Sequence, residues 1–380
     1  MIYIVTPYYF PSYGYGGPII SIKNLSQFFL KENTNYKIIT QNKDYTTGRI
    51  LKYSLEKETV YLGKRINIFS FLYKNVKEND IIYLNSFFAV FGSFYPMILS
   101  RFLYFNGRKH KLLISPRGEL LKNRIKNKST YLKIMYINFI KFLFFKHSNL
   151  SFIATSDYEI NDIRYFFKNK KILLMPNLIK PFSKFKLSNK LSLLKNNQTI
   201  KSKKYLKIVY FSRIHPCKGL DKIIKLLIDS GTKFKINIYG STDKSESYLK
   251  ICKNYTMKNK ESFSFLGSYR RNHLPEKTLN DYIFMYFPEG ENFSHCFFEA
   301  IMLGLIPFVP DSIPWRYGDR ELDELLFFKD FSKDDFKKKL TQLSKFSNSE
   351  LIEIIKKIYS SKLITHMLSN NSLEIKKIFY

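Results

Sequence analysis

The chain alternates short apolar runs with longer segments in which apolar residues recur every three or four positions. The first half reads IYIVTP, then IISIKNLSQFFLKE, then YKIITQ, DIIYLNS, KLLISP and SFIATS. Short apolar runs between amphipathic segments are typical of parallel strands, because helices cover both faces of such a sheet. The first half therefore predicts βα units around a parallel sheet.

The pattern lapses over 181–204, where the sequence is polar and basic without a stable period. Such a stretch is the best candidate for a linker. Alternation then resumes with YLKIVYFSR, GLDKIIKLLIDS, FKINIYG, SESYLKICKNY, SFSFLG, DYIFMYF and LIPFVPD, and the end of the chain from Asp334 is mostly helical and rich in lysine. We therefore predict an α/β protein with two Rossmann-like domains, at 1–180 and 181–360.

Composition agrees with a globular chain that has an unusual charge. A length of 380 residues suits two domains, and a hydrophobic fraction of 45% excludes a disordered protein. The net charge of +32 has two interpretations that the sequence leaves open. It reflects either AT-rich codon usage, which favours lysine, or attraction to an acidic partner such as anionic lipid, a phosphorylated substrate or nucleic acid.

The reactive side chains favour a reducing compartment and no metal centre. Cys217, Cys252 and Cys296 share no C-x-x-C spacing and are odd in number, and no histidine pair has the spacing of a zinc site. We expect a cytoplasmic protein with neither a disulfide framework nor a metal site. The first charge is Lys23, so the N-terminus predicts a buried strand and no signal peptide.

The window 81–100 contains twenty residues without a charge, which is long enough for a membrane span. Asn85, Gly92 and Pro96 interrupt it. We therefore predict a buried strand, a loop and a short helix there in place of a span.

Two glutamates stand out in the otherwise apolar stretch PEGENFSHCFFEAIMLG. Ser294 is a candidate N-cap, a helix is predicted from His295, and Gly304 is a candidate left-handed stop. The amides of the first helical turn attract anions, so a nucleotide diphosphate could bind there. Glu299 would then reach the paired ribose hydroxyls, and Glu291 would meet hydroxyls of a sugar. The alternative is that Glu291 is solvated and Glu299 pairs with a lysine.

Three further segments carry candidate ligand contacts at strand ends. In FSRIHPCKGLDKIIKLL, Arg213 and Lys218 flank a turn and could converge on one anion. In YGYGGPIIS, Gly16 and Gly17 allow close approach to a phosphate or sugar, although Ile19 breaks the G-x-G-x-x-G pattern. In KLLISPRGEL, Arg117 either contacts a phosphate or an acceptor, or is a surface arginine.

These segments together resemble the retaining GT-B glycosyltransferases of the family-4 kind. The E-x7-E and A-x-x-x-G signature of that family is similar to ENFSHCFFEAIMLG, and its Arg and Lys turn is similar to SRIHPCKGLD. Five motifs resemble bacterial members that build surface polysaccharides: YGGP, ISPRGEL, ATSDYEINDI, GENFSHCFFEA and PDSIPWR. The resemblance extends from Gly16 to Arg316.

The resemblance implies a GT-B fold, in which two Rossmann-like domains face an interdomain cleft. The domain at 181–360 would hold the nucleotide-sugar donor, the domain at 1–180 would hold the acceptor, and the final helix within 361–380 would cross back to the first domain. Glu299 would hold the ribose, while Glu291, Arg213 and Lys218 would form the catalytic set around the sugar and the diphosphate.

Further donor contacts are implied by the same motifs. Gly16 and Gly17 would face the donor phosphate and sugar, and the loop would contribute these residues: Asn292, Phe293, Ser294 and His295. No metal cofactor is implied, and the nucleotide-diphosphate sugar is a substrate. Retention follows from the resemblance, and front-face attack is favoured because no adjacent carboxylate is placed to act as a nucleophile.

Three departures from the family pattern bear on the site. Ser294 replaces the glycine of many members, Arg117 stands where many carry histidine, and MPNLIK replaces the commoner N-G-x-D junction. A narrower approach to the donor and the loss of a histidine contact to its sugar are the expected consequences.

The expected reaction is transfer of a hexose or N-acetylhexosamine to a lipid-linked saccharide in the synthesis of O-antigen (the polysaccharide of lipopolysaccharide), capsule or another bacterial surface polysaccharide. The aromatic and basic stretch LLKNRIKNKSTYLKIMYINFIKFLFFKHSN would lie on anionic lipid at the inner membrane face, or else in the core. The alternatives are a GT-B sugar-nucleotide epimerase or phosphorylase, or a nucleic-acid-binding protein. Because the basic residues are dispersed and not gathered in one module, nucleic acid is not an expected partner.

Overall fold

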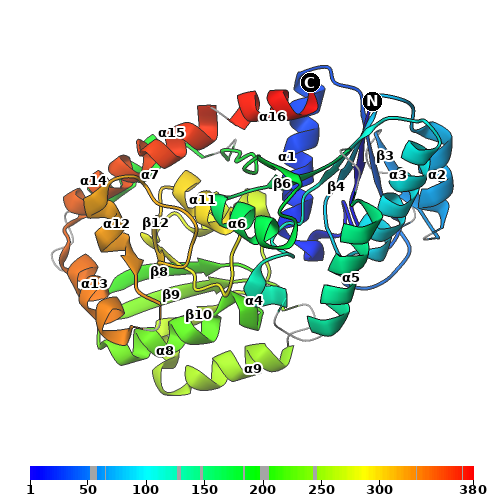
Figure 1. Cartoon of the computed structure of the whole chain (residues 1–380). Helices are drawn as coiled ribbons and strands as arrows, with labels where there is room; N and C mark the ends of the chain where they lie inside the picture. The colour runs from blue at the N-terminus through cyan, green and yellow to red at the C-terminus, as the bar shows by residue number, and fades with distance from the viewer. Residues whose placement is uncertain are drawn as a thin grey trace. The chain divides into compact units, whose positions relative to one another are not determined.

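The chain forms two compact units. The computed structural model describes residues 1–51, 58–64, 66–125, 130–145, 149–182, 185–196, 205–242, 246–330, 332–369 and 371–380. Unit 1 comprises Met1–Leu178 and Asn370–Tyr380, and unit 2 comprises Ile179–Ser369 (Figure 1). The chain thus leaves unit 1 near residue 180 and returns to it at the end.

The return begins later than the expected residue 361. Helix α15 (Lys362–Ser369) stays with unit 2, because its Ile364 and Met367 are buried in the core of that unit. Helix α16 (Asn371–Phe379) belongs to unit 1. There the Phe379 ring lies 5.0 Å from the Phe29 ring and 5.8 Å from the Tyr83 ring, between centroids.

Unit 1 contains a parallel sheet of seven strands within its described residues, in the order β3-β2-β1-β4-β5-β6-β7. The strands are β1 (Ile2–Val5), β2 (Tyr36–Gln41), β3 (Thr59–Leu62), β4 (Ile81–Leu84), β5 (Lys111–Ile114), β6 (Leu150–Ala154) and β7 (Lys171–Leu174). Ile2 and Ile4 pack in one apolar cluster while Tyr3 and Val5 pack in another. Both faces of the sheet are therefore buried, as the continuous apolar runs predict.

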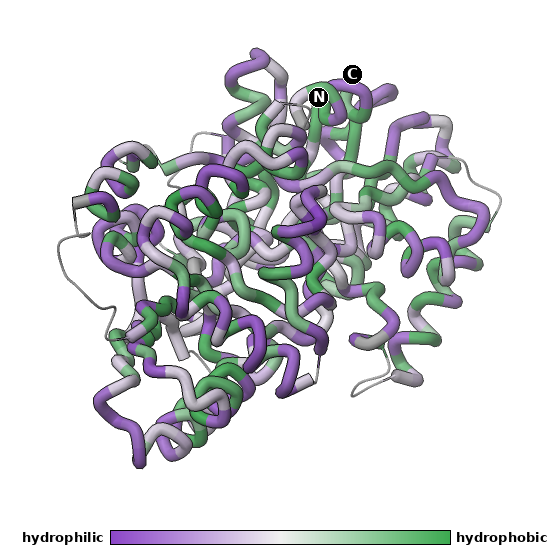
Figure 2. Tube along the Cα trace, turned by 90° about the vertical axis from the view of Figure 1, so that its left-hand side faces the viewer, coloured by the Kyte–Doolittle hydropathy of each residue, from purple (hydrophilic) through white to green (hydrophobic). Residues whose placement is uncertain are grey.

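The helices of unit 1 cover these two faces. They are α1 (Gly17–Lys31), α2 (Asn67–Asn75), α3 (Tyr95–Phe105), α4 (Lys122–Ile125), α5 (Thr130–Leu143), α6 (Asp157–Phe166) and α16, with the short 3-10 helix η1 (Tyr13–Tyr15) and the short π-helix η2 (Val90–Phe94). Along the helices the trace alternates between hydrophobic and hydrophilic colours (Figure 2). The window 81–100 forms β4, η2 and the start of α3, which confirms the strand, loop and helix predicted there. Within the described residues, no helix is both long and apolar enough to cross a bilayer.

Unit 2 contains a second parallel sheet, of six strands among its described residues, in the order β10-β9-β8-β11-β12-β13. The strands are β8 (Leu206–Phe211), β9 (Phe234–Tyr239), β10 (Phe263–Phe265), β11 (Ile283–Met285), β12 (Ile306–Pro310) and β13 (Phe327–Phe328). The helices are α7 (Leu187–Asn196), α8 (Leu220–Ser230), α9 (Glu246–Tyr255), α10 (Leu274–Lys277), α11 (His295–Met302), α12 (Arg320–Leu326), α13 (Lys333–Lys345), α14 (Asn348–Tyr359) and α15, with turns η4 (Pro216–Lys218), η5 (Met257–Ser262) and η6 (Arg271–His273). Both units are thus Rossmann-like, as predicted.

The predicted linker at 181–204 is wrong over its middle part. Residues 187–196 form α7, which packs on unit 2 through buried Leu194 and the fully buried side chain of Lys190. The Lys190 Nζ donates a hydrogen bond to the Thr278 carbonyl at 3.2 Å. A lysine at an interior position hides the apolar period of this helix. Residues 183–184 and 197–204 lie outside the described residues.

Candidate functional site

The turn between β8 and α8 brings Lys218 toward the end of β11. Gly219 adopts φ 63°, and a Cβ at this position would lie 1.9 Å from the carbonyl oxygen of Phe287. Because a side chain cannot occupy that space, glycine permits the turn to approach the backbone after β11. The close approach sets the position of the adjacent Lys218.

Lys218, Tyr286 and Glu291 form one hydrogen-bonded cluster in unit 2. The Lys218 Nζ lies 2.8 Å from the Glu291 Oε2 and 2.7 Å from the Tyr286 Oη, and the Tyr286 hydroxyl donates to the same Glu291 oxygen. The side chains of Lys218 and Glu291 are 16% and 11% exposed. The alternative in which Glu291 is solvated is therefore wrong.

The charges of Arg213 and Lys218 act on the same turn. Burial lowers the pKa of His215, and the charges of Arg213 and Lys218 lower it further. The imidazole Nδ1 accepts a hydrogen bond from the Cys217 amide at 3.3 Å, which caps η4. The turn therefore carries two cations beside a histidine whose neutral form is favoured.

Helix α11 begins at His295, as predicted, and is followed by Gly304 with φ 62°. Ser294 precedes it with φ 61° and ψ 76°, and its side chain makes no capping hydrogen bond. Its Oγ lies 3.4 Å from the Cys296 Sγ instead. The expected side-chain N-cap is thus wrong, since capping residues usually have an extended backbone and that of Ser294 is left-handed.

The loop before α11 is buried and tightly packed. Asn292 and Phe293 are buried, and the Phe293 ring stacks on Phe298 at a centroid distance of 4.8 Å. The Trp315 indole donates to the Phe293 carbonyl at 2.7 Å, and the His295 ring lies 5.0 Å from the Phe293 ring. This packing holds the backbone between Glu291 and α11 in place. The role of Phe293 as a donor contact stays a prediction.

Glu299, the fifth residue of α11, pairs with an arginine and not with a lysine. The Arg271 Nε donates to the Glu299 Oε1 at 2.5 Å, and the two side chains are 30% and 10% exposed. Burial raises the pKa of the Glu299 carboxyl, and the charge and hydrogen bond of Arg271 lower it in part. The Glu299 Oε1 is thus already occupied by the guanidinium of Arg271.

The remaining predicted residues, Gly16, Gly17 and Arg117, belong to unit 1. Gly16 has φ 82° and stands at the N-cap of α1, which begins at Gly17. Arg117 follows β5 and donates to three neutral acceptors, Asn85 at 2.6 Å, Tyr83 at 2.8 Å and Asn177. Its planar fork is thus held rigidly at the carboxyl end of the sheet by neutral groups.

A buried carboxylate braces the turn that carries Arg117. The Glu159 Oε1 accepts from the Gly118 amide at 2.6 Å, and its Oε2 accepts from the Thr155 amide at 2.8 Å and the Thr155 hydroxyl at 3.0 Å. The motifs ISPRGEL and ATSDYEINDI therefore meet in one hydrogen-bond network. Glu159 supports the turn structurally.

The sequence did not predict Tyr286 and Arg271 as site residues. Tyr286 is the penultimate residue of the apolar stretch DYIFMYF, where the sequence does not distinguish it from a core aromatic residue. Burial raises the pKa of Tyr286 well above the usual value. Arg271 lies 28 positions from Glu299 in the sequence, at the start of η6, in a segment with no recognisable motif. Strand order and the paths of the loops bring these residues to the glutamates, and neither can be predicted from the spacing of residues within a motif.

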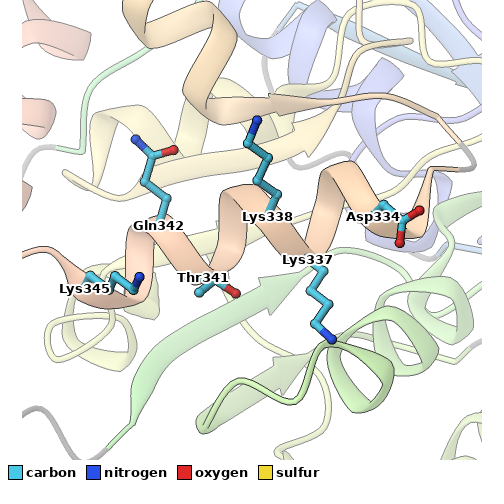
Figure 3. Close-up of a pocket in the computed structure, with 6 residues that line it drawn as sticks. All are labelled: Asp334, Lys337, Lys338, Thr341, Gln342 and Lys345. Carbon is cyan, nitrogen blue, oxygen red and sulfur yellow. The ribbon is translucent and has the colours of Figure 1, made fainter.

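A surface depression lies elsewhere in unit 2, on α13. Its lining residues are Asp334, Lys337, Lys338, Thr341, Gln342 and Lys345 (Figure 3). Lys337 and Lys338 point in opposite directions. The depression shares no residue with the candidate site. Among the described residues, no group of three or more His, Cys, Asp or Glu side chains could hold a metal ion.

Comparison with known proteins shows the fold. The chain matches no family model and no curated protein sequence. Among solved structures it is similar to sucrose-phosphate synthase from Thermosynechococcus elongatus, with a TM-score of 0.70, 11% identity, and coverage of 100% of this chain and 98% of that one. It is also similar to WaaG, a glycosyltransferase involved in lipopolysaccharide biosynthesis (TM-score 0.66, 12% identity, 100% and 99% covered).

A third similar structure is HepE of Anabaena in complex with UDP and glucose, with a TM-score of 0.66, 12% identity and coverage of 99% of each chain. These neighbours are glycosyltransferases of the GT-B fold, and they match this chain over its full length. The predicted GT-B fold is therefore confirmed, with its two Rossmann-like domains.

Proposed function

We propose that the chain is a glycosyltransferase that moves a hexose or N-acetylhexosamine from a nucleotide-diphosphate sugar to a lipid-linked saccharide. The product would be a bacterial surface polysaccharide such as O-antigen or capsule. The contact among Lys218, Tyr286 and Glu291 carries this proposal, because it holds a cation and a carboxylate together beside the start of α11. The glycosyltransferase fold and the five sequence motifs support it.

The cation and the helix start suit a departing diphosphate. We assign Lys218 and Arg213 to the diphosphate, since the leaving group gains negative charge in the transition state and fixed cations stabilise that charge. The N-terminus of α11, which begins at His295, is also assigned to the diphosphate, because the start of a helix attracts anions. Glu299 is assigned to the ribose, and Glu291 to hydroxyls of the donor sugar.

The proposed reaction needs no protein nucleophile. The acceptor hydroxyl attacks the anomeric carbon on the face from which the diphosphate departs, the bond from carbon to phosphate oxygen breaks, and the departing phosphate takes the acceptor proton. This course retains the configuration, as the family resemblance implies. Arg117 is assigned to the acceptor or a phosphate, and Gly16 and Gly17 to close approach of the donor.

We further propose that α5 rests on anionic lipid, where a lipid-linked acceptor is found. Leu132, Met135, Phe139 and Phe142 follow one another at helical spacing and are 66%, 52%, 43% and 82% exposed. An exposed apolar stripe of this kind is typical of a contact surface. The alternative was that this helix packs in the core. It holds for the opposite face of the helix, where Ile137 and Ile140 are buried. Residues 126–129 and 146–148 of the same stretch lie outside the described residues.

Donor binding and transfer test the proposal directly. A thermal-shift screen of UDP-, GDP-, CDP- and dTDP-sugars is expected to show one base that raises the melting temperature, because a ligand of the folded state stabilises it. With that donor, Lys218→Ala is expected to lower kcat/KM at least about 100-fold through loss of charge stabilisation. The matched control is Lys222→Ala, since Lys222 pairs with the more exposed Glu289. Undiminished turnover in a folded Lys218→Ala protein would overturn the assignment.

A further inference from the structure

Arg271 makes three separate contacts within unit 2. Besides its bond to Glu299, its Nη2 donates to the Lys180 carbonyl at 2.9 Å, and its guanidinium lies 4.2 Å from the centroid of the Phe182 ring. A guanidinium held by a carboxylate, a carbonyl and an aromatic face has little freedom to turn. Lys180 and Phe182 stand at the beginning of unit 2. Arg271 thus joins this segment to the carboxylate in α11.

The charge of Arg271 matters because Glu299 is buried. Among the residues that the structure describes, the titratable groups that interact with Glu299 are Arg271, Tyr269 and Cys296. Burial raises the pKa of Tyr269 well above its usual value and that of Cys296 to about 12, so both stay neutral near pH 7. Of these three described groups, Arg271 is the one whose charge offsets the cost of burying the Glu299 charge.

We infer that Arg271 is a positioning residue for nucleotide binding, which keeps the Glu299 carboxylate ionised and oriented toward a ribose. Arg271 occupies the Oε1 atom, so a ribose hydroxyl would donate to Oε2. A protonated carboxyl would offer a weaker acceptor to that hydroxyl, since hydrogen bonds to ionised groups are stronger. The inference rests on the proposed function and extends it to a residue outside the family motifs.

The binding of UDP as a function of pH tests the inference. Arg271→Gln removes the charge, so the pKa of Glu299 rises and the carboxylate becomes protonated at a higher pH than in the wild type. Calorimetric titration between pH 5.5 and 8.5 is expected to show about tenfold weaker UDP binding at the acid end than at the alkaline end, which corresponds to about one pKa unit. The wild type is expected to vary less over the same range.

Two further variants separate charge from simple disruption. Arg271→Lys keeps the charge, so its UDP affinity is expected to follow the wild-type pH profile even if it is weaker throughout. Arg320→Gln is the matched control, because Arg320 pairs with Glu324 at an exposed site, with side chains 90% and 68% exposed. Parallel pH profiles for Arg271→Gln and the wild type would overturn the inference.

Unfolding without nucleotide distinguishes failure of the inference from failure of the proposed function. In Arg271→Gln the Glu299 carboxyl has a higher pKa in the folded protein than in the unfolded protein. Its contribution to stability is therefore fully present at a pH below the pKa of the unfolded protein, and it is lost as the pH rises through the pKa of the folded protein. The melting temperature of Arg271→Gln is therefore expected to fall below that of the wild type by about 2 to 4 °C as the pH rises from 4.5 to 8. In a Glu299→Gln background this difference is expected to vanish.

The two experiments have separate meanings. If the wild type binds none of UDP, GDP, CDP and dTDP, the proposed function fails, while the unfolding cycle still reports on the ion pair. If Arg271→Gln and the wild type melt with the same pH dependence, Arg271 does not sustain the Glu299 charge, and the inference fails whatever nucleotide binds.

Discussion

Backbone conformation at single residues shapes the candidate site. Gly219 and Ser294 both adopt positive φ, one beside Lys218 and the other at the start of α11. At Gly219 the lack of a side chain is essential, since the Phe287 carbonyl fills the space of a Cβ. At Ser294 the same left-handed conformation is adopted by a residue that carries a side chain.

Replacement of Gly219 by alanine tests this close approach. The backbone must move, because a Cβ would lie 1.9 Å from a carbonyl oxygen. Gly231→Ala is the control: its φ is 70° and nothing lies within 4 Å of its Cβ position, so it is expected to cost about 1 to 2 kcal/mol for the left-handed conformation. Gly219→Ala is expected to cost at least about 1 kcal/mol more in urea unfolding. Equal losses of stability would show that the approach is not close.

Individual elements carry the contacts that the proposed function needs. Helix α11 presents Glu299 at its fifth position, and η6 carries the arginine that pairs with it. Helix α5 buries one face and exposes the other, with Leu132 and Phe142 on the exposed side. An amphipathic pattern is thus not enough to say which apolar stripe of a helix faces the core.

The exposed stripe of α5 predicts lipid binding. Phe139→Ser with Phe142→Ser is expected to lower recovery of the protein with vesicles that contain anionic phosphatidylglycerol, because apolar area enters the interface. Flotation measures this, and Ile251→Ser on α9 is the control, since Ile251 is 47% exposed in unit 2. Unchanged recovery of the double variant would contradict the proposal. Equal recovery of the wild type with neutral and with anionic vesicles would contradict the electrostatic part of the proposal.

At the scale of the whole molecule, the chain supplies unit 1 from both of its ends. The rings of Phe29, Tyr83 and Phe379 meet there, and the Lys376 Nζ lies 2.6 Å from the Glu32 Oε2. The last helix therefore completes the core of the first domain. The core of unit 1 therefore combines residues that are more than 300 positions apart in the sequence, such as Phe29 and Phe379.

Phe379→Ala is expected to loosen unit 1 selectively. Removal of a buried phenylalanine ring costs about 3 to 5 kcal/mol, and Phe379 is 6% exposed. Amide hydrogen exchange is expected to quicken in β1 and β4 while β8 and β11 keep their rates, since those strands belong to unit 2. Leu373→Ala, on the same helix at 57% exposure, serves as the control. Uniform acceleration in both units would argue against separate stability.

Local pattern was sufficient for much of the fold. The parallel strands, the helix from His295, the left-handed Gly304 and the strand and helix in 81–100 follow from apolar spacing and turn chemistry, which act over a few residues. A linker was predicted over the middle of 181–204, where the structure has α7. The prediction is wrong because Lys190 occupies a buried position of this helix. A charged residue in a core position defeats any pattern based on polarity.

The sequence by itself determined the two α/β units, the positions of the glutamates on and before α11, and the turn that carries Arg213 and Lys218. The tertiary structure alone decided their partners: Tyr286 with Lys218 and Glu291, Arg271 with Glu299, and Asn85 with Arg117. The physical reason is that periodicity reports which face of an element is buried, whereas a hydrogen-bond partner depends on strand order and on where each loop ends. Those are set by packing across tens of residues.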